Sequence, residues 1–141
     1  MWLFNKAKLK DIWDDPVAQP LGDIEAAHRI RAICRDAAGC AEAVGSPGRR
    51  SPKQQQIERD RYERAAKAAM ETAMKISDAL VRDSAVREIV GLCLKANNIK
   101  TGRALFRAIH AGSIKAEVLR EHPMLEEEGA CADPAGSARQ A

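Results

Sequence analysis

The sequence has few aromatic residues, and this scarcity bears directly on the fold. Five of its 141 residues are Trp, Tyr or Phe, and 45% are apolar, with alanine strongly represented. Aromatic residues favour strands, whereas alanine has the highest helix propensity. A chain of this length forms about one domain and can bury an adequate core. The composition therefore predicts a small all-α protein.

Features of secreted and membrane proteins are also missing. The four cysteines form no CxxC pair, and the apolar start of the chain precedes its lysines, the wrong order for a secretory signal. The longest apolar run, 89–94, is much shorter than a membrane span. We therefore expect a cytoplasmic protein with reduced thiols and no membrane span.

Motifs for catalysis are likewise missing. The sequence contains no GxSxG, no HExxH and no glycine-rich phosphate loop. His28, Cys34 and Cys40 are six residues apart, so on a helix each is turned by about 240° from the one before and they cannot share a metal ion. We therefore expect no enzymatic activity, no cofactor and no metal site.

Prolines, glycines and charge divide the chain into three parts. An aromatic N-terminal arm with its linker covers 1–22, a helical domain covers 23–123, and an acidic tail covers 124–141. The tail has no aromatic residue and no apolar period, so it cannot bury enough surface to offset its ordering entropy. We expect it to be disordered.

Two alanine-rich segments predict an antiparallel helical hairpin. The first helix is expected to run from Asp23, as N-cap, to Gly45, and the second to begin at Ser51 and Pro52, which suit the cap and the first helical position. In both helices apolar residues recur at steps of three and four. In the second helix these residues are Tyr62, Ala66, Ala69, Ala73 and Ile76.

The next segment, 77–123, is open to several interpretations. One helix from about 52 to 96 would be unusually long for a compact domain, and capping-type pairs occur at 77–78 and 83–84. We therefore expect a break between these pairs, followed by shorter helices in an irregular bundle. Their expected bounds are 84–96, with Val86, Ile89, Val90 and Cys93 inward, then 101–110, then a helix capped by Ser113 and ended by His122 and Pro123.

A DNA-binding helix-turn-helix is one alternative for this segment. Ala108, Gly112 and Val118 have the spacing of its small residue, turn glycine and buried aliphatic residue. However, Arg107 and Ser113 occupy positions that this motif usually buries, and the following helix has few base-reading residues.

A short α-solenoid-like stack is the other alternative. Residues after Ile76 align with those after Ile109 at an offset of 33 residues, which is close to the period of stacked helical repeats. Repeat-like and irregular packing both produce consecutive antiparallel helices, and both suit a binding scaffold better than a catalyst.

Two surfaces are candidates for binding. The first is the N-terminal arm, where Trp2, Leu9, Ile12 and Trp13 would be costly to expose and resemble interface anchors; the alternative is that the arm folds back on its own chain. The second is a basic helical face for phosphate or an acidic partner. Its residues are Lys100, Arg103 and Arg107.

These features predict a non-catalytic protein–protein interaction module that acts as an adaptor, regulator or subunit. The partner would be another protein or a second copy of the chain. The alternative is a small nucleic-acid-binding regulator that uses the basic helical face. Residues 51–123 carry fourteen basic and nine acidic residues, which is compatible with nucleic acid but does not require it.

Overall fold

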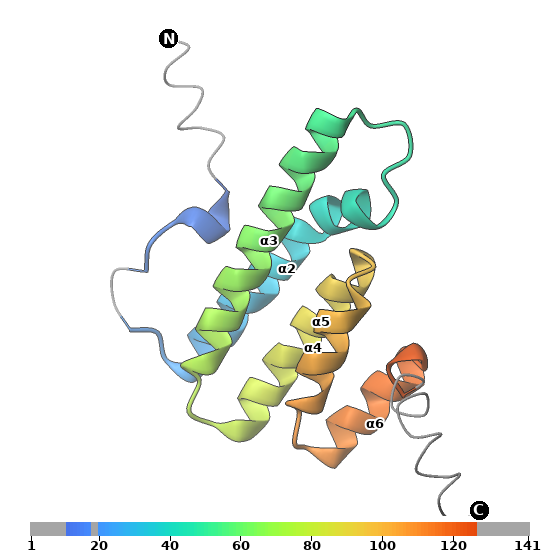
Figure 1. The fold of residues 1–141 in the computed structure, drawn as a ribbon. Coiled ribbons are helices and arrows are strands. Elements are labelled where there is room, and N and C mark those ends of the chain that lie inside the picture. Colours follow the sequence, from blue (N-terminus) through green and yellow to red (C-terminus); the bar gives the residue numbers. More distant parts are fainter. Residues whose placement is uncertain (1–10, 18–19, 127–141) are drawn as a thin grey trace, which may run out of the picture.

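The computed structural model describes residues 11–17 and 20–126, and all regular structure within them is helical (Figure 1). The predicted all-α fold is therefore confirmed. A short 3₁₀ helix, η1, precedes five α-helices. The bounds are η1 Ile12–Asp14, α2 Asp23–Gly45, α3 Pro52–Met74, α4 Ala79–Lys95, α5 Ile99–Arg107 and α6 Gly112–Glu121.

The helices form an irregular bundle in which α2 and α3 make the predicted antiparallel hairpin (Figure 1). Helix α4 reverses direction again, so it runs parallel to α2. It contacts α2, α3, α5 and α6 and is therefore the central helix of the described fold. A side-chain carbon at Gly45 would overlap the carbonyl oxygen of Lys95, so the C-terminal ends of α2 and α4 approach closely.

The predicted seam of α3 is buried along its whole length, from Tyr62 to Ile76. The seam of α2 is wider than predicted because that helix packs on two neighbours, α3 and α4. Ile30, Ile33 and Cys40 of α2 all lie in the core. Burial of both faces, rather than helix propensity alone, holds α2 in place.

The start of α3 follows its local sequence, but the start of α2 does not. The Ser51 hydroxyl accepts a hydrogen bond from the Gln54 backbone N–H at 3.1 Å, as predicted. The N-cap of α2 is Gly22 rather than Asp23. The Asp23 carboxylate instead accepts the backbone N–H groups of Ser77 and Asp78, at 2.9 and 2.8 Å. It therefore joins the start of α2 to the α3–α4 turn.

Helix α4 begins five residues earlier than predicted. Asp78 is its N-cap, whereas Asp83 lies inside the helix with only 1% of its surface exposed. Asp83 Oδ2 accepts the backbone N–H groups of His110 and Ala111, at 3.0 and 2.8 Å. Asp83 thus acts as a distant cap for the turn before α6, and Ala111, rather than the predicted Ser113, is the N-cap residue of that helix.

Asparagines lie between α4 and α5, and α5 begins two residues earlier than predicted, at Ile99. Asn97 has a positive φ of 60°, and Asn98 caps α5 through the backbone N–H of Thr101. Asn98 Nδ2 also donates to the Tyr62 hydroxyl at 3.0 Å, which ties this turn to α3. Helices α4 and α6 begin 33 residues apart, matching the offset in the sequence, although α4 has 17 residues and α6 has 10.

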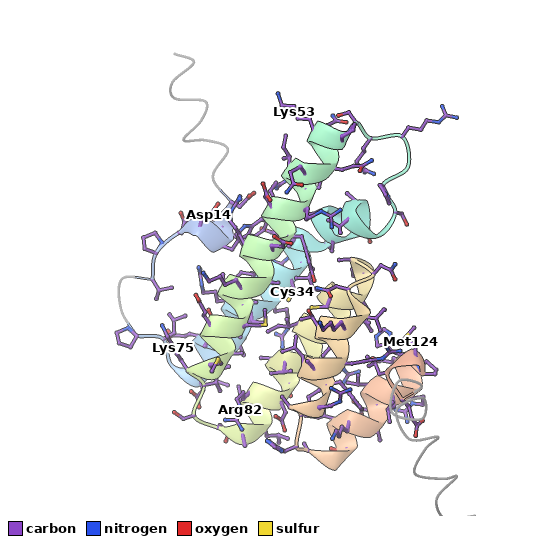
Figure 2. All side chains as sticks on the ribbon, in the orientation of Figure 1. Asp14, Cys34, Lys53, Lys75, Arg82 and Met124 are labelled. Carbon is purple, nitrogen blue, oxygen red and sulfur yellow. The ribbon has the colours of Figure 1, made fainter. Side chains whose placement is uncertain are left out.

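The helical domain extends beyond both predicted boundaries. Trp13, predicted as part of a separate arm, is 5% exposed and belongs to the core. At the other end, Leu125 is 4% exposed, and Arg103 donates to the backbone oxygen of Met124, at 2.8 Å from Nη2 (Figure 2). The packed core therefore includes Leu125, which lies beyond the predicted boundary at Pro123. The predicted tail from residue 127 onward lies outside the described residues.

Because Asp23 accepts hydrogen bonds from the α3–α4 turn, we expect the stability of the fold to depend on pH. Hydrogen bonds from Ser77 and Asp78 lower its pKa below the ordinary 3.8, so the charged carboxylate is favoured in the folded state. The carboxylate stabilises the folded protein at pH values above its pKa in the unfolded chain. This stabilisation is lost as the pH falls through the lower pKa that the group has in the folded protein. We expect wild type to melt at a higher temperature than Asp23→Asn at pH 7 and the difference to shrink below pH 3.8. A difference in melting temperature that stays constant to about pH 2 would show that the charged carboxylate of Asp23 does not stabilise the fold.

Candidate functional site

A groove of about 770 Å³ lies between the parallel helices α2 and α4. A smaller hollow of about 200 Å³, lined by Ile24 and Val81 among others, continues it toward the N-terminal ends of both helices. Arg31 lines both hollows, so the two are adjacent. The last residues of α6 form a third wall of the larger hollow. We call the two hollows together the α2/α4 groove.

The inner surface of the groove is built from short or apolar side chains. Cys34 and Ala38 contribute from α2, and Gly91 and Leu92 from α4. A side-chain carbon at Gly91 would meet nothing within 4 Å, so the space above this residue is open. Small residues of this kind let the backbone of a docking segment approach closely.

The rim of the groove is predominantly positive. Arg31, Arg35 and Lys95 line it, and all three are exposed. Within the described part of the chain, Arg31 and Lys95 make no hydrogen bond or ion pair. Arg35 has only a loose ion pair at 3.8 Å with its exposed neighbour Asp36, and such pairs contribute little. These cations are therefore available to an acidic group.

Arg87 also lines the groove, but its charge is already matched. Its guanidinium donates to Glu117 at 2.6 Å and to Glu121 at 2.8 Å. These two ion pairs hold α6 against α4. They also place the Glu121 carboxylate on one side of the groove, so this wall is unfavourable for a continuous polyanion.

The N-terminal end of the groove is more apolar. Ile24 lines the smaller hollow from the start of α2 and is 60% exposed, and the half-buried Val81 lines it from the start of α4. Leu80, which precedes Val81 and lies outside the hollow, is 58% exposed. Large apolar side chains so exposed are candidate contacts for another protein. The groove is thus most apolar at the helix starts and is lined by cations from its middle, at Arg31, onward.

The buried thiols are poorly suited to nucleophilic chemistry. Burial raises the pKa of Cys34 to about 12, with a smaller effect from the negative charge of Glu88. Burial also raises the pKa of Cys40 to about 11. Since the thiolate is the reactive form, these residues act as small core side chains near neutral pH. Figure 2 shows Cys34 toward the inside of the bundle.

The predicted basic face on α5 is only partly available. Lys100 and Arg107 are exposed, whereas Arg103 is half-buried and donates to the backbone oxygen of Met124. Arg103 therefore helps to hold the end of the described chain against α5. None of these three residues lines the α2/α4 groove, so the structure contains two separate basic surfaces.

The described part of the N-terminal arm docks on its own chain. Trp13 is buried, Ile12 packs against the core, and the Arg61 guanidinium lies 5.8 Å from the centroid of the Trp13 ring. Arg61 also donates twice to Asp11, at 2.8 and 3.1 Å, and Arg64 donates to Asp14 at 3.2 Å. Of the two alternatives for this arm, residues 11–14 take the intramolecular one (Figure 2).

The other two predicted anchors, Trp2 and Leu9, lie outside the described residues. In the described part of the chain, no three His, Cys, Asp or Glu side chains are placed to hold a metal ion. The helices found there are also too short or too polar to cross a membrane.

Comparison of the chain with protein-family models, curated proteins and solved structures finds no match. The fold and the groove therefore define the class of this protein by themselves: it is a small all-α bundle with a hollow between two parallel helices.

The sequence interpretation missed the groove residues. Arg31 and Lys95 are 64 positions apart, and they reach one rim only because α2 and α4 pack in parallel. A partial signal was present: Arg31 and Arg35 are four residues apart on one helical face, beside the apolar seam.

Proposed function

We propose that this chain is a non-catalytic protein–protein interaction module that docks a segment of a partner in the α2/α4 groove. The observation that carries the proposal is the pair of unmatched cations, Arg31 and Lys95, on a groove that is open at Gly91. Recognition of a helix in a groove is a recurrent mode of protein binding. The module would serve as an adaptor, regulator or subunit. Three buried free thiols support a reducing, cytoplasmic setting.

The alternative, a nucleic-acid-binding regulator, has weaker support. Strong binding to nucleic acid requires many unmatched cations, whereas Arg103 is already held by the oxygen of Met124. Helix α6 would be the recognition helix of a helix-turn-helix, yet its Glu117 and Glu121 are about half exposed and would repel phosphates.

The proposal predicts that filling the groove abolishes partner binding without unfolding the protein. Gly91→Leu adds a side chain where the structure has open space, so it blocks the groove while the helix stays intact. Gly39→Leu is the matched control because Gly39 is also in a helix interior with open space around it, but it does not line the groove. We expect wild type and Gly39→Leu to capture the same partner from the source organism, and Gly91→Leu to lose it.

Melting curves of the three proteins would exclude unfolding as the cause. A partner that is retained equally by Gly91→Leu would overturn the groove as the binding site. A captured complex that disappears after nuclease treatment and weakens steeply with salt would instead support the nucleic-acid alternative. Its log–log salt slope would be roughly −0.9 per phosphate contacted on duplex DNA.

A further inference from the structure

The two ends of the α2/α4 groove favour different kinds of side chain on the molecule that binds there. The N-terminal end presents Ile24 and Val81, which are best covered by apolar side chains. Arg31 lies at the middle of the groove, where it lines both hollows, and Arg35 and Lys95 lie toward the C-terminal end. These cations are best matched by carboxylates. One occupant can satisfy both ends only if its own apolar and acidic residues are segregated along its length.

The length of the groove fits a short helix. Ile24 to Ala38 on α2 and Val81 to Lys95 on α4 each span fourteen residues, which at 1.5 Å per residue is about 21 Å. A helix of roughly fourteen residues covers this distance in about four turns. The small residues Ala38 and Gly91 leave room for its backbone.

Helix dipoles determine the preferred direction. Helix α4 ends at Lys95, so its C-terminal end, which carries partial negative charge, lies at the cationic end of the groove, whereas α2 continues beyond the groove to Gly45. An antiparallel helix would place its positive N-terminal end there. Its acidic residues would then lie in its own first turns, where negative charge also stabilises a helix.

We infer that the α2/α4 groove binds an acidic amphipathic helix of a partner protein, antiparallel to α2 and α4. Its N-terminal half carries carboxylates over Arg31, Arg35 and Lys95, and its C-terminal half carries apolar side chains against Ile24 and Val81. This inference rests on the docking function proposed above and specifies the partner's chemistry.

Nucleic acid fits the same groove less well. Glu88 lines both hollows, and Glu121 lines the larger one, so a chain of phosphates would meet carboxylates as well as cations. Among the described residues, no Trp, Tyr or Phe on which bases could stack lines the groove. A helix can direct its carboxylates to the cations alone, whereas a polyphosphate cannot.

The test uses the full-length chain and a labelled synthetic helix of fourteen residues, with glutamates in its first half and leucines on one face of its second half. A second peptide has the two halves exchanged, and a third has lysine in place of every glutamate. We expect the first peptide to bind, as measured by fluorescence anisotropy. The exchanged peptide should bind at least about tenfold more weakly, since its charges then face the apolar end of the groove.

Charge-reversed variants identify the contacts. The double variant Arg31→Glu, Lys95→Glu should bind the first peptide roughly tenfold or more weakly than wild type does, and it should bind the lysine peptide more tightly. The matched control is Arg59→Glu with Lys53→Glu, because both residues are exposed on α3 and outside the groove. We expect the control to bind the first peptide within about twofold of wild type.

Three outcomes would overturn the inference: equal binding of the first and exchanged peptides, equal weakening by the control variant, or displacement of the first peptide by single-stranded RNA or duplex DNA at about 150 mM salt. The proposed function is tested separately by Gly91→Leu. If that variant loses the natural partner while no acidic peptide binds, the groove docks a protein but the acidic helix is wrong.

Discussion

Replacing Trp13 by alanine is expected to lower the free energy of unfolding by about 3–5 kcal/mol, the usual cost of removing a large buried aromatic side chain. Trp13 is 5% exposed and packs in the core shared by η1, α2 and α3. The substitution also removes the ring below the Arg61 guanidinium. Urea denaturation followed by helical circular dichroism measures the loss.

Trp13→Phe is the matched control for this substitution. It keeps a ring under Arg61, and it removes an indole N–H that has no hydrogen-bond partner among the described residues. We therefore expect Trp13→Phe to lose less than half of what Trp13→Ala loses. A loss below about 1 kcal/mol for Trp13→Ala would show that the arm contributes little to the core and would contradict the intramolecular docking of η1.

Removing the Asp83 carboxylate is expected to cost about 2–5 kcal/mol. Asp83→Ala leaves the N–H groups of His110 and Ala111 without their acceptor, and each unsatisfied group costs roughly 1–3 kcal/mol when buried. Because this carboxylate holds the turn before α6, its loss should also weaken the attachment of that helix to α4. Denaturation midpoints measure the first effect, and limited proteolysis after α5 detects the second.

Two controls isolate the role of the Asp83 hydrogen bonds. Asp83→Asn retains an oxygen that can accept both N–H groups, so we expect a smaller loss than for alanine. Ser84→Ala changes the adjacent exposed residue and should leave stability within about 0.5 kcal/mol. Equal losses for Asp83→Asn and Asp83→Ala would mean that the charge, rather than the capping geometry, is what stabilises the turn.

The features that were predictable from sequence are those with local causes. Ser51 and Pro52 mark the start of α3 because the cap and its acceptor are three residues apart. Asp23 and Asp83 resemble local caps equally well, but their acceptor oxygens serve N–H groups 54 and 27 residues away. An aspartate before a helix has the same local appearance in both cases, so only the tertiary structure distinguishes them.

The candidate site depended on tertiary structure even more strongly. The aromatic residues of the arm suggested an interface, yet Trp13 packs in the core of its own chain, and Arg61 and Arg64 of α3 match the charges of Asp11 and Asp14 beside it. Those ion pairs join residues about 50 positions apart. The hairpin of α2 and α3 was predictable from its alanine seams, but the parallel packing of α4 on α2, which creates the groove, has no comparable periodic signal.

The central position of α4 has a consequence for the order in which the protein opens. Local fluctuations expose amide hydrogens to exchange with solvent, and the free energy required differs between regions of one fold. Among the described helices, α6 packs mainly on α4 and adds the contact of Lys115 with Phe106 of α5, so it can detach while the remaining helices stay packed. Helix α4 is enclosed by α2, α3 and α5, and its amides become accessible only when the whole core separates. Deuterium uptake in α4 therefore reports global unfolding, whereas uptake in α6 reports a partial opening beside the third wall of the groove.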